Sequence, residues 1–105
     1  MLLARDALGE RPLYYTVVGD TLLFSTEIKC FLAHRAFSVA PNRAALSRLL
    51  VFSFLPGPET MFEGVLEVEA GCHVAWDGAT ARSSPHWDVA EDLLDEPDDV
   101  LIDRV

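Results

Sequence analysis

The sequence predicts an α+β fold in which antiparallel β-hairpins pack against two short helices. Two pairs of β-favouring runs are joined by tight-turn signals, Gly19-Asp20 in the first half and Asp77-Gly78 in the second. Between these hairpins, apolar residues recur at helical spacing. Half of the 105 residues are hydrophobic, which suffices for the core of one modest domain.

Three extended runs open the chain, at residues 2–5, 13–18 and 21–25. A turn over residues 6–12 separates the first two runs, and Gly19-Asp20 joins the others, because glycine reaches positive φ without steric strain. Residues 2–4 of the first run are apolar on both faces, as in a central strand with two neighbours. The hairpin after it supplies at most one neighbour, so we expect the other from polypeptide outside this sequence.

Two helices are expected in the middle of the chain. The first runs to about His34, with Ser25 or Thr26 as its cap and Glu27 placed favourably at its positive end. The second follows Asn42, a plausible N-cap, and Pro-Gly-Pro closes it before residue 59.

The pattern after the second helix is less distinct. Residues 59–71 fit either a helical turn with a following strand or an irregular buried loop. Residues 73–76 and 79–82 then read as two strands around a two-residue Asp-Gly turn.

The net charge of −9 is concentrated at one end of the chain. Residues 88–105 carry eight acids and Arg104, which leaves nine acids and seven bases before them. This balance argues against nucleic acid or an anionic membrane as a partner. The start of the chain has no signal-peptide pattern and no apolar run reaches the length of a membrane span, so we expect a cytoplasmic protein.

No self-contained catalytic or metal-binding signature is present in the sequence. Cys30 and Cys72 match no zinc spacing and are expected to be reduced core residues. His73 follows Cys72 on an expected strand, and adjacent strand residues point to opposite faces, which argues against a nucleophile pair. We therefore predict no catalytic residue and no metal ligand in this chain.

One charged segment stands out between two apolar strands: Arg5-Asp6, Gly9 and Arg11-Pro12. Asp6 is expected either to accept hydrogen bonds from the turn or to pair with Arg5 or Arg11. Gly9 would supply an unusual backbone conformation, and Pro12 would stiffen entry into the next strand. A tight connection tied by a charge-assisted bond explains these residues, and a direct ligand contact is the alternative.

Several motifs together resemble one known family. Residues 5–15 resemble the Arg-Asp-x-x-Gly-x-Lys/Arg-Pro-Leu segment of class II glutamine amidotransferases, and residues 24–29 resemble the Phe-Ala-Ser-Glu-Ile-Lys stretch behind it. Residues 52–65, Ala70-Gly71 and residues 86–88 are similar to the corresponding runs of glutamine-hydrolysing asparagine synthetases, in the same order. This order is more specific than any one motif.

The resemblance implies a partial N-terminal-nucleophile hydrolase, whose complete fold is an αββα sandwich of two antiparallel sheets between helical layers. Residues 1–88 would form the C-terminal part of the glutaminase domain, and residues 89–105 an acidic linker toward a synthetase domain. Departures from the family pattern occur at Glu10, at Thr26 and at residues 70–72, where the last loop is expected to differ.

By the same resemblance, the chemistry of the family lies outside the matching residues. Its nucleophile is an N-terminal cysteine upstream, and its ATP-binding Ser-Gly-Gly-x-Asp-Ser loop lies downstream. The complete enzyme would bind glutamine and use ATP and magnesium, whereas this chain should hold no cofactor and be inactive alone. The residues expected to form a structural or interdomain motif are Arg5, Asp6, Gly9, Arg11, Pro12, Glu27 and Lys29.

Three relationships to a parent protein remain open at this point. The chain could be part of an asparagine synthetase, with the missing N-terminal half and synthetase domain as its partners. It could instead be a non-catalytic small subunit that completes a separately encoded half by strand addition. The third alternative is a related amide-forming cyclase that keeps the fold and changes the acceptor.

Overall fold

The computed structural model describes residues 1–89 and contains both helices and strands, which confirms the α+β class. The linker was expected at residues 89–105, of which residues 90–105 lie outside the described residues. The elements in chain order are β1 (Leu2–Ala4), β2 (Tyr14–Val18), β3 (Thr21–Ser25), the 3₁₀ helix η1 (Ile28–Ala33), α1 (Arg43–Phe52), β4 (Val65–Glu67), β5 (Cys72–Trp76) and β6 (Ala81–Pro85).

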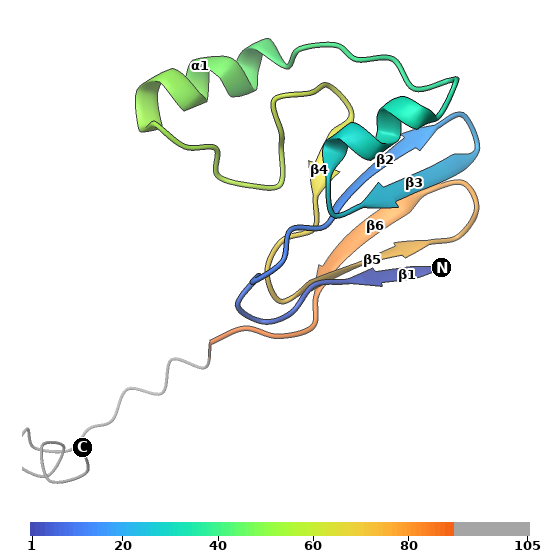
Figure 1. Cartoon of the computed structure of the whole chain (residues 1–105). Helices are drawn as coiled ribbons and strands as arrows, with labels where there is room; N and C mark the ends of the chain where they lie inside the picture. The colour runs from blue at the N-terminus through green and yellow to red at the C-terminus, as the bar shows by residue number, and fades with distance from the viewer. Residues whose placement is uncertain (90–105) are drawn as a thin grey trace, which may run out of the picture.

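The strands form two three-stranded antiparallel sheets, in the orders β1-β5-β6 and β3-β2-β4 (Figure 1). β1 pairs with β5, with Leu3 opposite Val74, so its neighbour comes from the second hairpin. The hairpin that follows β1 was expected to supply at most one neighbour, and it supplies none, because β2 and β3 belong to the other sheet. Among the strands of residues 1–89, β1 lies at the edge of its sheet and not at the centre, where it was expected.

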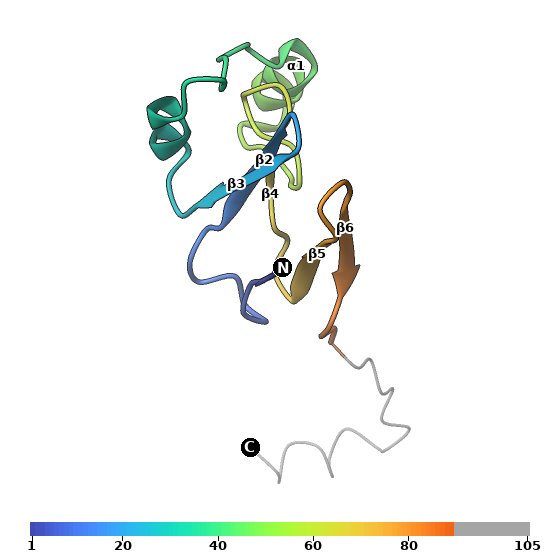
Figure 2. The same ribbon diagram turned by 90° about the vertical axis from the view of Figure 1, so that its right-hand side faces the viewer.

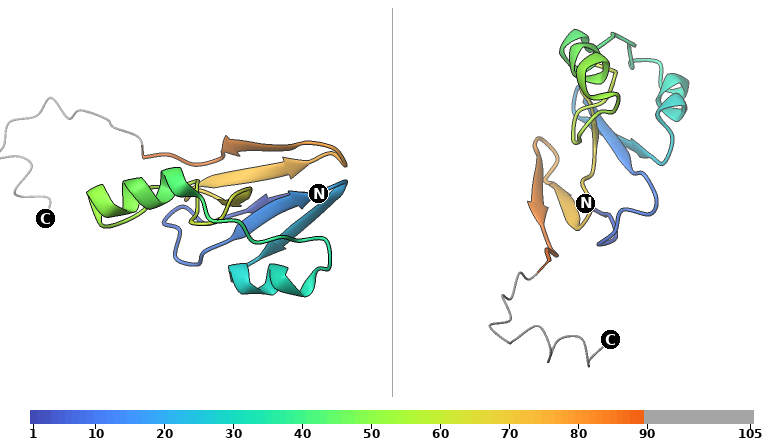
Figure 3. Two further views of the ribbon diagram at one scale, coloured as in Figure 1. Left: turned by 90° about the horizontal axis from the view of Figure 1, so that it is seen from above. Right: turned by 90° about the vertical axis from the view of Figure 1, so that its left-hand side faces the viewer.

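The core lies where the two sheets face each other. Leu3 and Val74 from one sheet meet Tyr15 and Leu22 from the other, and Val68, just after β4, completes the cluster. Figures 2 and 3 show the two helices beside the β3-β2-β4 sheet and the β5–β6 hairpin on the opposite side of the molecule. Full burial of an aliphatic side chain contributes about 1.5–3 kcal/mol, so these few residues supply much of the stability.

The two hairpins have different turns. Gly19-Asp20 forms the expected two-residue turn, with Val18 opposite Thr21 and Gly19 at a φ of 63°. The second hairpin was expected to have a two-residue turn as well, and this is wrong: Trp76 pairs with Ala81 across a loop of residues 77–80.

The side chain of Asp77 explains the longer loop. Its Oδ1 accepts hydrogen bonds from the amides of Ala79 at 2.9 Å and Thr80 at 2.7 Å. These two amides are therefore not available to a strand, and β6 begins at Ala81 instead of at residue 79. The same bonds, led by that from Thr80, hold the pKa of Asp77 below its ordinary value.

The first helix is shorter than expected and is a 3₁₀ helix. Ser25 does not cap it: its Oγ accepts from the amide of Glu27 at 3.2 Å, which stabilises a bend before the helix while Glu27 remains extended. The helix contacts β3. Its buried residue is Phe31, whose ring meets that of Phe37 edge-on at 5.6 Å.

The second helix begins as expected. Asn42 Oδ1 accepts from the amide of Ala45 at 3.1 Å, which confirms the N-cap. The helix ends at Phe52 because Ser53 adopts the left-handed conformation at a φ of 62°, several residues before the prolines expected to close it. Arg48 pairs with Glu59 and so ties α1 to the segment before β4.

The ambiguous stretch 59–71 contains the short strand β4, flanked by loops that are partly buried. The buried hydroxyl of Thr60 donates to the carbonyl of Val65 at 2.9 Å and accepts from the amide of Phe62 at 3.2 Å. Residues 59–71 are therefore a strand with a hydrogen-bonded entry loop, which carries β4 alongside β2.

Candidate functional site

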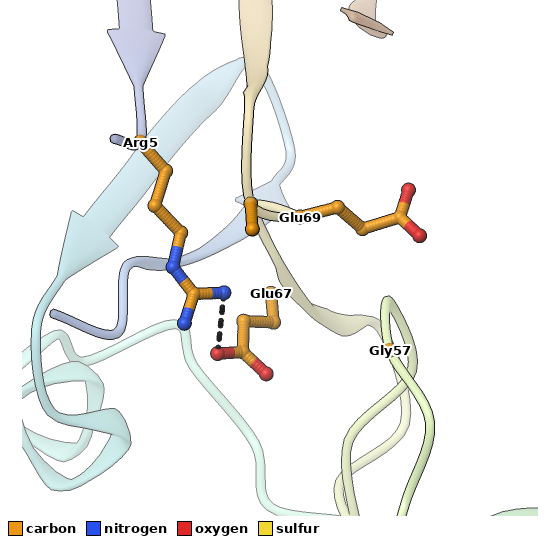
Figure 4. Close-up of a pocket in the computed structure, with 5 residues that line it drawn as sticks. Arg5, Gly57, Glu67 and Glu69 are labelled. Atoms are coloured by element: carbon orange, nitrogen blue, oxygen red, sulfur yellow. Dashed lines mark ion pairs between the residues drawn. The ribbon is translucent and has the colours of Figure 1, made fainter. Parts of the chain in front are cut away.

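The side chain of Arg5 is the centre of the candidate site. Its Nε donates to the carbonyl of Arg11 at 3.0 Å, and its two terminal nitrogens donate to the carbonyls of Val68 at 2.8 Å and Gly9 at 2.9 Å. One terminal nitrogen also lies 2.8 Å from Glu67 Oε1, as Figure 4 shows. A guanidinium has five N–H donors, so these partners occupy nearly its whole capacity. Arg5 is therefore a structural tie between β1, the following turn and β4.

Gly9 is required by the space around this guanidinium. Its φ is 65°, and a Cβ there would lie 3.0 Å from the Cβ of Ala70 and 3.1 Å from Cζ of Arg5. Glycine thus provides both the backbone conformation and the room that Arg5 needs.

Asp6 organises the turn between β1 and β2. Its Oδ1 accepts from the amides of Leu8 and Glu10, each at 3.1 Å, and its main-chain carbonyl accepts from Gly9 at 3.1 Å and Gly71 at 2.9 Å. Asp6 was expected either to accept hydrogen bonds from the turn or to pair with Arg5 or Arg11. The structure shows the first of these arrangements. The pKa of Asp6 lies below its ordinary value, chiefly because its carboxylate accepts the hydrogen bond from the amide of Glu10.

The remaining residues of the predicted motif gather at a second place. Arg11, Pro12, Thr26 and Glu27 line a hollow of about 300 Å³. Lys29 Nζ lies 2.6 Å from Glu27 Oε2, and this hydrogen bond raises the pKa of Lys29. Both side chains are exposed, so the pair contributes little to stability. The structure therefore divides the predicted motif into a tied cluster around Arg5 and an open surface around Glu27.

A hollow of about 310 Å³ lies beside the Arg5 cluster, lined by Arg5, Gly57, Glu67, Glu69 and Ala70 (Figure 4). Its polar groups are two carboxylates and a guanidinium that already has internal partners. One of the two carboxylates, that of Glu67, is paired with the guanidinium of Arg5. The hollow is therefore a polar surface beside the hydrogen bonds of Arg5.

Sequence reasoning did not single out Glu67, although it is the ionic partner of Arg5. The available signal was one acid within the apolar run from Val65 to Val68. Burial is the main cause that raises the pKa of Tyr14, and the negative charge of Glu67 is the second cause. Glu67 lies opposite Tyr14 in the pairing of β2 with β4.

The other polar groups within residues 1–89 include two cysteines and a pair of neighbouring histidines. Cys30 is exposed, Cys72 is half-buried and neither is in a disulfide. The rings of His73 and His86 lie 6.2 Å apart, and His86 Nε2 donates to the carbonyl of Arg5 at 2.9 Å. No group of three or more potential metal ligands occurs in this part of the chain. Neither of its helices has the length and apolar character of a membrane span.

Comparisons with known proteins agree with the sequence motifs. A family model described as a glutamine amidotransferase domain matches residues 1–87. Glutamine-hydrolysing asparagine synthetase 3 of Bacillus subtilis is 31% identical over 100 residues, which are 93% of this chain and 16% of that protein. Asparagine synthetase 1 of the same organism is 35% identical over 68 residues, which are 65% of this chain and 11% of that protein.

Amidase chry2 of Gibberella zeae is 36% identical over 103 residues, which are 91% of this chain and 15% of that amidase. No solved structure matches the chain. The chain thus spans only 16% of the length of the first of these relatives.

Proposed function

Because the chain belongs to the glutamine amidotransferase domain family, we propose that it forms the C-terminal part of the glutaminase domain of an asparagine synthetase-type enzyme. In this proposal the two sheets are one side of an N-terminal-nucleophile hydrolase sandwich. The parent enzyme hydrolyses glutamine and uses the ammonia for ATP-dependent amidation of aspartate in the cytoplasm.

The observation that carries this proposal is the set of partners bound by the side chain of Arg5. The side chain that the family motif places first is bound to three carbonyls and to Glu67, all within this chain. A guanidinium with these partners positions β1 and β4 and is not available for a substrate. The contribution of this chain is therefore scaffold, and the groups that cleave glutamine come from the rest of the domain.

ATP and magnesium belong to the complete enzyme in this proposal. Magnesium prefers near-octahedral oxygen coordination, and residues 1–89 present no cluster of three or more carboxylate or imidazole ligands. The described residues do not fit the ion, and no step proposed for this chain passes through it.

A chimeric enzyme tests the proposal. Residues 1–87 replace the matching segment of asparagine synthetase 3 of Bacillus subtilis, and glutamine-dependent release of glutamate and ammonia is measured. We expect saturable glutaminase activity from the chimera and none from the isolated chain. Ammonia-dependent synthesis by the same chimera shows that the remainder of the enzyme is folded.

Two results would contradict the proposal. Saturable glutaminase activity of the isolated chain would place catalytic groups within residues 1–105, against the scaffold role. A chimera that keeps ammonia-dependent synthesis and loses glutaminase activity would show that these residues cannot serve in such a domain.

A second candidate parent is a related amide-forming enzyme in which the same glutaminase scaffold serves a different acceptor, and the relatives include a protein named as an amidase. Sequencing of the flanking coding region separates part of a longer enzyme from a small subunit. An upstream frame that begins Met-Cys and a downstream Ser-Gly-Gly-x-Asp-Ser loop support part of a longer enzyme. An independent start and stop support a small subunit that pairs with a separate half.

A further inference from the structure

Two histidines lie on the face of the β5–β6 hairpin that points away from the core. Val74 of β5 is in the core, and side chains alternate along a strand, so the adjacent His73 points to the other face of the sheet. His86 follows β6, and its amide donates to the carbonyl of Gly71 at 2.8 Å, which continues the antiparallel pairing by one step. The two histidines are thus diagonal neighbours on one face, with their ring centroids 6.2 Å apart.

The backbone at His86 is held in place although its side chain is exposed. The amides of His86 and Trp87 both donate to the carbonyl of Gly71, at 2.8 Å and 3.0 Å. A Cβ at residue 71 would lie 2.6 Å from the carbonyl oxygen of Trp87, so this close approach requires glycine. The imidazole of His86 is therefore attached to a segment that is tied to the start of β5, beside the turn that follows β1 (Figure 1).

Each of the two imidazoles uses its Nε2 atom within the chain. His86 Nε2 lies 2.9 Å from the carbonyl oxygen of Arg5. A carbonyl only accepts, so this Nε2 carries the proton, and Nδ1 of the neutral ring keeps its lone pair. His73 Nε2 lies 3.0 Å from Ser84 Oγ, and a ring that donates this bond also keeps a lone pair on Nδ1. A partner on one ring nitrogen is what selects and orients the metal-binding nitrogen in histidine sites.

The separation of the rings allows one metal ion to contact both. A metal–nitrogen bond of about 2.0–2.1 Å puts a ring centroid about 3.2 Å from the ion, so two imidazoles on one ion can have centroids up to about 6.4 Å apart. The distance of 6.2 Å between the rings of His73 and His86 lies within that limit. Within residues 1–89 no third potential ligand joins them, so water would complete the coordination. Imidazole suits zinc, copper and nickel, whereas magnesium prefers oxygen ligands.

We propose that His73 and His86 bind one divalent transition-metal ion, such as zinc, through their Nδ1 atoms. The ion would join β5 to the segment that follows β6, and the hydrogen bond from His86 to Arg5 would connect it to the end of β1. Two protein ligands hold zinc more weakly than the four of a closed structural site, so the ion would be exchangeable. The inference goes beyond the proposed function and does not depend on it.

Calorimetric titration of the full chain with zinc chloride tests this site. The unchanged chain should bind one zinc ion saturably. His73→Gln and His86→Gln each remove one of the two ligands, and the loss should weaken binding about tenfold or more. His34→Gln is the matched control, because it removes the remaining histidine, which lies at the end of η1. The control should bind zinc as well as the unchanged chain.

Proton NMR of the imidazole rings locates the ion without any substitution. One equivalent of zinc should shift the ring signals of His73 and His86 together and leave those of His34 in place. Amide-exchange protection of Val74 shows that a variant is folded, and for a variant that has lost it the NMR result on the unchanged chain decides.

Three results would overturn the inference. The first is the absence of saturable zinc binding by the unchanged chain. The second is equal affinity in all the variants, or a loss in His34→Gln as large as that in His73→Gln. The third is a zinc-induced shift of only one of the two rings, because the ion would then have a single imidazole ligand.

Discussion

Arg5 and Glu67 form an ion pair with 2.8 Å between Nη1 and Oε1, which joins the end of β1 in one sheet to the end of β4 in the other. The side chains are 14% and 26% exposed, so solvent screens the pair only in part. The guanidinium also holds the carbonyls of Gly9 and Val68. This one residue thus fixes how the two sheets and the first turn lie relative to one another.

Arg5→Ala is expected to lower the free energy of unfolding by about 2–4 kcal/mol, because it leaves Glu67 and three carbonyls without their donor. Urea unfolding followed by circular dichroism measures this change. Glu67→Gln keeps the shape of the partner and should lose about 1 kcal/mol. Equal losses in the two variants would show that the carbonyl bonds of Arg5 contribute nothing.

Gly9→Ala and Gly19→Ala can be compared directly because the two glycines have nearly the same backbone conformation, with φ at 65° and 63°. A Cβ at residue 19 meets nothing within 4 Å, whereas one at residue 9 meets Ala70 and Arg5. We expect a loss of about 1 kcal/mol at residue 19 and about 2–3 kcal/mol at residue 9. Thermal unfolding of both variants measures the difference, and identical losses would contradict the crowding at Gly9.

Asn42→Ala should destabilise the protein by about 1 kcal/mol because the amide of Ala45 loses its cap. Ser47→Ala is the control on the same helix, since its exposed hydroxyl only donates back to the carbonyl of Arg43. The control should change stability by less than about 0.5 kcal/mol. Chemical denaturation of the two variants under one condition provides the comparison.

The pH dependence of stability should include a contribution from Asp6. Its pKa in the folded protein lies below the ordinary value of 3.8, chiefly because of the hydrogen bond from Glu10. The stabilisation from its charged form is therefore present above that value and is lost as pH falls through the lower folded pKa. Asp6→Asn should flatten the fall in melting temperature below about pH 4. An unchanged slope in this variant would contradict the assignment.

The exposed side of α1 should make the isolated chain prone to association. Leu50 and Val51 are 77% and 74% exposed and lie beside Phe52 and Phe54. Leu50→Glu with Val51→Lys should reduce association in light scattering, with helix content unchanged. A sharp cooperative melt of a monomeric unchanged chain would count against the view that this is part of a domain.

The sequence allowed prediction of the features that depend on near neighbours. Gly19-Asp20 and Asn42 act within a few residues, so turn and cap chemistry could be read directly. Asp77 is also local, yet the competition of its side chain for two amides was missed, and β6 was therefore placed too early.

Features that depend on distant residues were not predictable from pattern. Arg5 was singled out as the centre of a charged turn, but Glu67 lies on another strand, and only the pairing of β4 with β2 brings it close. The partner of β1 was missed for the same reason, because β5 begins at Cys72. Charge and apolarity identify which residues need partners, whereas topology decides which partners they find.

The bonds between Met1 and Trp76 have a consequence for synthesis of the protein on the ribosome. The amino group of Met1 donates to the carbonyl of a residue 75 positions later, and the amide of that residue donates back. Within residues 1–89, β1 therefore meets its partner β5 only after nearly all of these residues have been made. Until then Leu3 lacks Val74, the residue opposite it in the finished sheet, and its apolar side chain is open to chaperones.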